Sequence, residues 1–218
     1  MDNDNNELVI DGWTMRVRRP AGVGPFPVIL LLHGWTGDEN SMWMFASRLP
    51  RDALLIAPRA LFPATSSGYS WHLPISKSWP WVDDFKNSVE KIYTIISQNY
   101  FPDGDFSNLH LIGFSQGAAL AYSMAIIRPD RVTSIAGLSG FVPDGASTWL
   151  SAGRLHEMPV FVAHGTQDEL VPVDKARLSV ELLEQAGAVV TYCEDNVGHK
   201  LSAKCFHGLE AFYQKNNC

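Results

Sequence analysis

The chain has 218 residues, of which 46% are hydrophobic, and its formal net charge is −6 at pH 7. This length fits one domain with a substantial core. Because no composition break, repeat or low-complexity linker interrupts it, we expect a single domain over residues 1–218. An acidic balance without a basic run argues against nucleic-acid binding. No apolar stretch approaches the ~20 residues of a membrane span, so we expect no stable membrane anchor.

The N-terminal segment and the cysteines bear on the cellular compartment. Residues 1–7 are acidic and polar and lack the basic and apolar regions of a signal peptide. The three cysteines, Cys193, Cys205 and Cys218, are an odd number and show no metal-ligand spacing. We therefore expect reduced thiols in a cytoplasmic protein, with no metal site.

Apolar runs alternate with helical patterns along the chain. In chain order, the expected elements are a strand or interrupted hairpin over 8–18, a strand over 28–32, a helix over 42–49, a strand over 53–57, a helix over 82–99, a strand over 109–112, a helix over 118–127, strands over 132–138 and 160–163, a helix over 175–186, a strand over 189–193 and a helix over about 201–214. Strands separated by helices predict βαβ units and a mostly parallel sheet covered on both faces. In such a sheet the functional site lies at the carboxyl ends of the strands.

The pentapeptide Gly113-Phe114-Ser115-Gln116-Gly117 lies between an expected strand and an expected helix. A serine on so tight a turn has its hydroxyl pushed out of the fold, and the flanking glycines avoid Cβ clashes. The following helix directs free N–H groups and its positive dipole end to the place where an oxyanion would form. A chance match in a loop is the alternative, which the flanking elements disfavour. We therefore predict that Ser115 is a nucleophile.

A serine nucleophile needs a base to take its proton and a third group to orient that base. On a sheet of this kind the partners follow in the order serine, acid, histidine. His199 follows the last expected strand in a glycine-containing loop and is our candidate base. His207 lies inside the final expected helix, where a lone histidine is usually structural or solvated.

Asp168 is the favoured acid because it directly follows the expected strand over 160–163. Asp195 is its main rival, only four residues before His199, although an aspartate in such a loop more often makes a local turn hydrogen bond. Asp174 fits the N-cap position of a helix.

An oxyanion hole needs two aligned donors. We expect one to be the backbone N–H of Gln116 and the other to come from the loop 33–38, with the N–H of Trp35 as the best candidate. His33 in that loop fits a scaffold role better than that of a second base.

Four segments resemble the phospholipase/carboxylesterase family of α/β-hydrolases: Leu32-His33-Gly34, 113–118, 164–172 and Gly198-His199. The resemblance covers roughly residues 25–215. It implies an α/β-hydrolase fold and hydrolysis of carboxyl esters, in some members of thioesters, without metal or organic cofactor. It also implies that Ser115, Asp168 and His199 are nucleophile, acid and base.

Two segments depart from the eukaryotic thioesterases of that family. Residues 35–40 replace their Gly-Leu-Gly-Asp type loop, and the segment 68–84 is longer and richer in tryptophan. Both departures favour a bacterial-type esterase over an enzyme that removes palmitate from proteins.

The expected substrate walls come from an aromatic segment and two strand ends. No long insertion separates Leu138 from Trp149, so we expect no large cap domain. The alternative for the tryptophans is core packing. Without an arginine cluster near these loops, a strongly anionic substrate is disfavoured. The candidate substrate-binding residues are Trp71, Trp79, Trp81, Phe141, Leu170 and Val171.

These observations predict a serine carboxylesterase that acts on short- to medium-chain acyl esters through an acyl-enzyme intermediate. The alternatives are a thioesterase or lysophospholipase with the same triad and, more remotely, a non-catalytic ligand-binding homologue. We expect a monomer or weak homodimer whose partner is a small-molecule ester.

Overall fold

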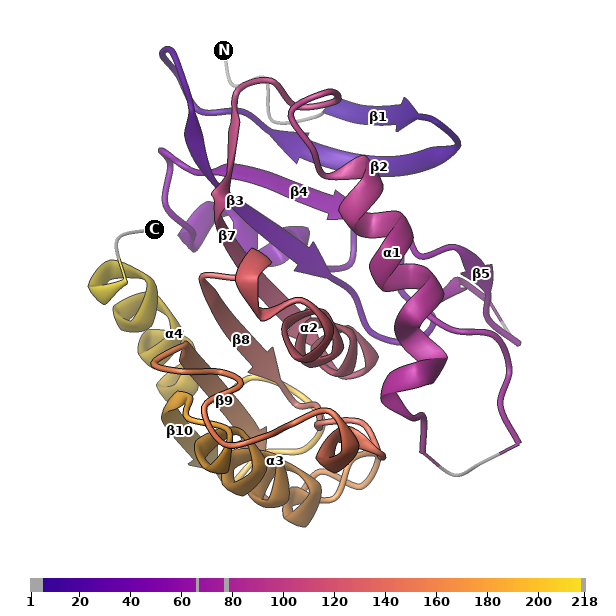
Figure 1. The fold of residues 1–218 in the computed structure, drawn as a ribbon, viewed down its shortest axis with the longest axis vertical. Coiled ribbons are helices and arrows are strands. Elements are labelled where there is room, and N and C mark those ends of the chain that lie inside the picture. The colour runs from indigo at the N-terminus through magenta and orange to yellow at the C-terminus, as the bar shows by residue number, and fades with distance from the viewer. Residues whose placement is uncertain (1–5, 66, 77–78, 217–218) are drawn as a thin grey trace.

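The computed structural model describes residues 6–65, 67–76 and 79–216. Its centre is an eight-stranded sheet in the order β1-β2-β4-β3-β7-β8-β9-β10, shown in Figure 1. The strands from β4 to β10 run parallel, whereas β1 pairs antiparallel with β2 and β2 with β4. The strands are β1 (Asn6–Ile10), β2 (Trp13–Arg18), β3 (Phe26–Leu32), β4 (Leu54–Pro58), β7 (Gly104–Phe114), β8 (Ser134–Leu138), β9 (Pro159–Gly165) and β10 (Val189–Asp195), and a separate ribbon pairs β5 (Phe62–Pro63) with β6 (Tyr69–Ser70).

Helices cover both faces of this sheet. They are α1 (Lys86–Ile95), α2 (Gln116–Ile127), α3 (Val173–Gln185) and α4 (Ala203–Lys215), with short 3₁₀ helices η1 (Trp43–Arg48), η2 (Val82–Phe85), η3 (Pro129–Arg131) and η4 (Ala146–Thr148). One apolar core lies beneath α1, α2 and α3 and includes Val89, Ile92 and Leu183. A second core lies beneath η1 and α4 and includes Phe45 and Leu209. The expected architecture, a mostly parallel sheet with helices on both faces, is confirmed.

The continuous apolar run of β3 follows from this two-sided burial. Val28, Leu30 and Leu32 enter one core, and Ile29 and Leu31 enter the other. Successive side chains of a strand point to opposite faces, so a strand covered on both faces is apolar at every position.

Some boundaries differ from expectation. The segment 8–18 is a hairpin that turns at Asp11-Gly12, where both residues have positive φ. The helix expected over 82–99 is divided into η2 and α1 and ends at Ile95. β7 begins at Gly104, five residues before the expected start. Its first half contains polar residues, so the apolar pattern of the sequence does not reveal it. This half pairs with the start of β3, and the register shifts at a bulge between Pro27 and Val28.

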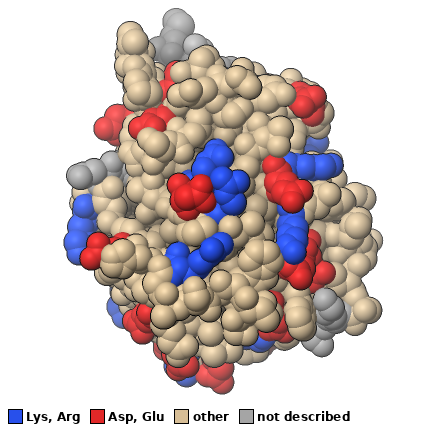
Figure 2. Space-filling model, viewed as in Figure 1, with Lys and Arg blue, Asp and Glu red and all other residues tan. Residues whose placement is uncertain are grey.

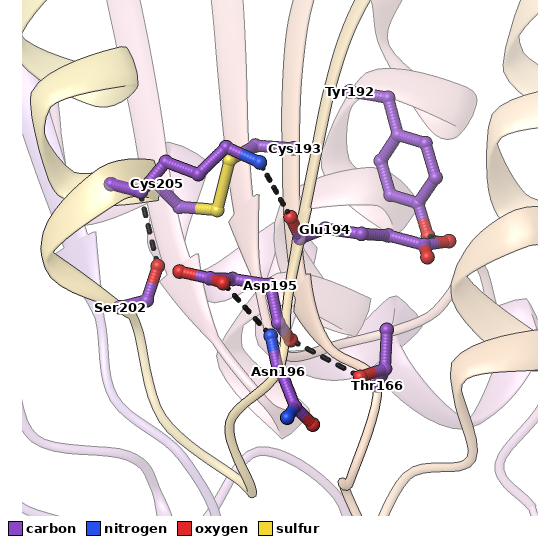
Figure 3. Close-up of a disulfide and its surroundings, with 9 residues drawn as sticks. Thr166, Tyr192, Cys193, Glu194, Asp195, Asn196, Ser202 and Cys205 are labelled. Atoms are coloured by element: carbon purple, nitrogen blue, oxygen red, sulfur yellow. Dashed lines mark hydrogen bonds between the residues drawn. A yellow bond between two sulfur atoms is a disulfide. The ribbon is translucent and has the colours of Figure 1, made fainter.

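The prediction of reduced thiols is wrong for two of the three cysteines. Cys193 of β10 and Cys205 of α4 form a disulfide across a sequence separation of 12 (Figure 3). The pairing arises because α4, capped by Ser202, returns along the end of β10. Cys218 lies outside the described residues.

On the face drawn in Figure 2, acidic and basic side chains lie interspersed and form no large patch of one charge. Within the described part of the chain, no helix is both long and apolar enough to cross a membrane.

We expect the disulfide to stabilise the fold by closing the loop that carries His199. The double variant Cys193→Ala/Cys205→Ala should lose about 3 kcal/mol of unfolding free energy, because the unfolded chain regains loop entropy. Equilibrium urea unfolding measures this loss. A dithiol reductant should lower the wild-type midpoint and leave the double variant unchanged; equal midpoints with and without reductant would contradict the role.

Candidate active site

Ser115 occupies a strained turn between β7 and α2. Its backbone has φ 54° and ψ −116°, a conformation that side-chain-bearing residues rarely adopt. A Cβ on Gly117 would lie 2.0 Å from the carbonyl oxygen of Leu32, and a Cβ on Gly113 would lie 2.2 Å from the carbonyl oxygen of Gly117. The predicted need for glycine on both sides of the serine therefore has two causes: the first turn of α2 lies against the end of β3 at Gly117, and the end of β7 lies against that same turn at Gly113.

Hydrogen bonds fix this turn at both ends. The N–H of Ser115 donates to the carbonyl of Leu138 at 2.8 Å, and the N–H of Ala118 donates to the carbonyl of Ser115 at 3.0 Å. Every residue of α2 from Gln116 to Ile126 is buried, so the helix cannot shift without disturbing the core. The serine is thus presented from a rigid support.

Asp168 and His199 come together from the ends of neighbouring strands, β9 and β10. Nδ1 of His199 lies 2.7 Å from Oδ2 of Asp168, where an Nδ1–H donates to a carboxylate. Oδ1 of Asp168 accepts the N–H groups of Leu170 and Val171, both at 2.9 Å. The Asp168 side chain is fully buried, so these bonds fix its rotamer and direct one oxygen at the imidazole.

His164 lies beside this pair but does not compete for the carboxylate. Its Nε2 is 2.8 Å from the carbonyl oxygen of Val171 and 3.4 Å from Oδ2 of Asp168. Burial lowers the pKa of His164, and the carbonyl oxygen of Val171, which can only accept, requires the hydrogen on Nε2.

The rival residues have local partners. Oδ1 of Asp195 accepts the N–H of Asn196 at 2.9 Å, the turn bond expected of it (Figure 3). Asp174 is not an N-cap, because Pro172 holds that position and Asp174 pairs instead with Arg177. His207 is exposed on α4.

The loop after β3 carries Trp35 and is held in place by His33. Nδ1 of His33 lies 2.7 Å from the carbonyl oxygen of Gly34, and its Nε2 accepts the N–H of Ala60 at 3.0 Å. Burial lowers the pKa of His33, which favours the neutral ring that these two bonds require. These contacts agree with the expected scaffold role and leave neither ring nitrogen for a reacting proton.

An ion pair between a buried carboxylate and a half-buried arginine supports the same loop. Glu39 is almost fully buried and accepts from Nε of Arg59 at 2.6 Å and from Nη2 at 2.9 Å. Arg59 also lies over the ring of Tyr69, 4.8 Å from its centroid. The N–H of Thr36 donates to the carbonyl of Tyr69 at 3.0 Å, which joins the loop to the aromatic segment.

These loops surround a cleft of about 830 Å³ that contains Ser115 and His199 in its lining. None of the described lining residues is a lysine, arginine, aspartate or glutamate. The lining residues are Gly34, Trp35, Thr36, Pro63, Ala64, Thr65, Ser70, His72, Pro74, Ile75, Trp79, Pro80, Phe114, Ser115, Gln116, Phe141, Leu170, Val171 and His199.

Four of the six expected substrate-binding residues line this cleft: Trp79, Phe141, Leu170 and Val171. The ring of Trp79 packs edge-on against Phe141 at 4.8 Å, while Leu170 is 70% exposed at the mouth.

The other two tryptophans lie outside the cleft lining. Trp71 is fully buried against the loop 33–38, and its Nε1–H donates to the carbonyl of His33 at 2.7 Å. Its expected place in the substrate wall is therefore corrected to a core position. Trp81 is 43% exposed and lies next to Gly145, also away from the lining.

The sequence did not predict the residues that join the aromatic segment to the serine turn. Ser70 and His72 line the cleft and contact the side chain of Gln116, a residue for which only the backbone has an expected role. The described residues between β6 and η2, 71–76 and 79–81, belong to no helix or strand, so no periodicity marks Ser70 and His72 in the sequence.

The arrangement has the parts of an acyl-transfer site. A serine hydroxyl and an imidazole line one cavity, and a buried carboxylate orients that imidazole. The first N–H groups of α2 are free of helical partners and lie beside the serine, as oxyanion binding requires.

Comparisons with known proteins identify the family of this chain. The family model described as Phospholipase/Carboxylesterase matches residues 21–217. Acyl-protein thioesterase 1 of Yarrowia lipolytica is 26% identical over 186 residues, 77% of this chain and 80% of that protein. Carboxylesterase SOBER1 of Arabidopsis thaliana is 27% identical over 205 residues, 86% of this chain and 89% of that protein.

Among solved structures, the Bacillus cereus carboxylesterase superposes with a TM-score of 0.83 at 22% identity, covering 94% of this chain and 95% of that one. This likeness supports the fold, and the family match covers most of the chain. The chain therefore belongs to the phospholipase/carboxylesterase family of α/β-hydrolases and is a carboxylic ester hydrolase.

Proposed function

We propose that the protein is a serine carboxylesterase in which Ser115 is the nucleophile, His199 the base and Asp168 the orienting acid. The observation that carries the proposal is the 2.7 Å bond between His199 and buried Asp168, in a cleft that also contains Ser115. The Gly-x-Ser-x-Gly turn supports it, because its strained geometry has no evident structural purpose other than to expose the hydroxyl.

The chemistry follows from these positions. Nε2 of His199 takes the proton of Ser115 as Oγ attacks the ester carbonyl, and Asp168 stabilises the imidazolium that forms. The backbone N–H groups of Gln116 and Trp35 bind the oxyanion. His199 then gives the proton to the departing alcohol, and water activated by His199 hydrolyses the acyl-enzyme to the free acid.

The proposed substrate is a neutral ester with a short- to medium-length acyl chain. The cleft is lined mostly by apolar side chains, and its described lining carries no formal charge that would bind an anion or cation. Trp79 and Phe141 form the best-packed part of the wall, and we assign the acyl chain to their side of Ser115.

Thioester hydrolysis is the second candidate function, because the same triad cleaves both bonds. Several relatives are named acyl-protein thioesterases, among them the Saccharomyces cerevisiae protein, 31% identical over 166 residues. The replaced loop at 35–40 and the tryptophan-rich segment favour the ester.

Two expectations remain predictions. One is the monomeric or weakly dimeric state. The other is the cytoplasmic location, against which the Cys193–Cys205 disulfide weighs, since disulfides rarely persist in the reducing cytosol.

Ser115→Ala should lower kcat by ~10⁴-fold or more on a chromogenic acetate ester, since the covalent intermediate is lost. The serine lies on a rigid turn, so the melting temperature should change little. His199→Ala should cost a similar factor, and the double variant little more, because a triad acts as a unit. Near-full activity in either single variant would contradict the assignment of that residue as nucleophile or base.

Asp168→Asn should lower kcat by about 10³–10⁴-fold, whereas Asp195→Asn should keep most activity. The introduced asparagine would use its oxygen for the Leu170 and Val171 N–H groups and turn its NH₂ towards His199, which selects the wrong imidazole tautomer. Steady-state kinetics on one ester compares the two variants, and the reverse ranking would transfer the acid role to Asp195.

We expect different effects from Trp79→Ala, which alters the cleft wall, and from Trp71→Ala, which alters the core. Loss of the Trp79 ring removes apolar surface that a hexanoyl chain contacts and that acetate hardly reaches, so the hexanoate-to-acetate ratio of kcat/KM should fall by about tenfold. Loss of fully buried Trp71 should instead cost about 3–5 kcal/mol of unfolding free energy. Urea unfolding and a chain-length series on both variants provide the check, and a Trp79 variant with unaltered selectivity would exclude that ring from the acyl wall.

A further inference from the structure

The amide of Gln116 has a fixed orientation. Its Oε1 accepts the backbone N–H of Trp71 at 2.9 Å, and a backbone N–H can only donate. The NH₂ group must therefore lie on the other side, where it donates to Oγ of Ser70 at 3.1 Å and to Nε2 of His72 at 3.0 Å. Gln116 is buried, so these bonds are not replaced by water.

The same reasoning fixes the state of His72. Its Nδ1 lies 2.7 Å from the carbonyl oxygen of Leu73, which can only accept, so Nδ1 carries the hydrogen. Nε2 of the neutral ring is then an acceptor, as the Gln116 NH₂ requires. His72 also packs edge-on against Phe85 at 5.2 Å, which holds the ring plane.

This cluster, the Gln116 side chain with Ser70, Trp71 and His72, is called the Gln116 clasp. It lies at the start of the chain segment that supplies Pro74, Ile75, Trp79 and Pro80 to the cleft.

The other end of that segment is held separately. The N–H of Asp144 donates to the carbonyl of Pro80 at 3.0 Å, and the N–H of Val82 donates to the carbonyl of Asp144 at 3.1 Å. The wall residues that the structure describes are thus flanked by two hydrogen-bonded points, at 70–72 and at 80–82, and the clasp is the one that contacts the serine turn.

The backbone of Gln116 is fixed by other bonds. The N–H of Ser115 and the N–H of Ala118 set the turn through the carbonyls of Leu138 and Ser115. One residue therefore has two separable tasks: its N–H faces the oxyanion, and its side chain faces the wall.

We propose that His72 is a positioning residue that, through the Gln116 clasp, holds the cleft wall against the serine turn and so sets acyl-chain selectivity. The proposal rests on the ester hydrolysis proposed above. A held wall offers apolar contact to each methylene of a longer acyl chain, whereas acetate reaches little of it. A released wall loses those contacts and penalises long chains selectively.

The test compares p-nitrophenyl hexanoate with p-nitrophenyl acetate, which share a leaving group. His72→Phe keeps a ring against Phe85 but removes the acceptor, so the hexanoate-to-acetate ratio of kcat/KM should fall by about tenfold. His72→Gln places an oxygen near the position of Nε2 and should restore the ratio to within about threefold of wild type. The fall of the ratio in His72→Phe should come mainly from a higher KM for hexanoate, and its recovery in His72→Gln from a KM for hexanoate near that of the wild type.

Two further variants sharpen the result. Gln116→Met removes the amide but keeps the backbone N–H and should lower the ratio like His72→Phe; the double variant should lower it no further, because both remove one interaction. This pair keeps the test valid if one variant folds poorly. Leu73→Ala, an exposed neighbour outside the cleft lining, is the matched control and should leave the ratio unchanged.

The outcomes separate this proposal from the one it rests on. A wild-type protein that hydrolyses neither ester overturns the proposed function and this inference with it. Active variants whose ratio stays at the wild-type value overturn the clasp alone, as does a His72→Gln variant that behaves like His72→Phe. A fall in His72→Phe with recovery in His72→Gln supports it.

Discussion

The contact between the N-terminus of α2 and the end of β3 governs the rest of the site. A Cβ on Gly117 would lie within 2.0 Å of the Leu32 carbonyl oxygen, so the helix touches the strand without any side chain between them. Ser115, the residue that precedes this helix, has a positive φ of 54°. The contact also places the first N–H groups of the helix next to the loop that begins at His33, the arrangement that two oxyanion donors need.

Buried polar groups behind the cleft order the loops that form it. The carbonyl of His33 accepts from the indole of Trp71, and the amide of Gln116 joins the serine turn to the aromatic segment. Glu39 and Arg59 pair beside the loop 33–38. A buried polar group left unpaired would be costly, so these loops share one low-energy arrangement. The described cleft lining contains no lysine, arginine, aspartate or glutamate, which suits the neutral ester that we propose as substrate.

The sequence by itself determined the order and type of most elements, because strands buried on both faces must be apolar throughout and each is followed by a helical or loop pattern. It also determined Ser115, Asp168 and His199 as candidates, since residues after parallel strands meet at one edge of the sheet. That rule uses only the order of strands and loops in the sequence and does not depend on which loops contact one another.

Only the tertiary structure decided the features that depend on contacts between distant segments. Trp71 and Trp79 look equivalent in sequence, yet one fills the core against the loop 33–38 and the other faces the cleft. The Cys193–Cys205 bond depends on how α4 returns along β10, and the hydrogen bond of His72 is made with a glutamine 44 residues away. Irregular segments carry no periodicity, so their side chains take their places from the surfaces against which they pack.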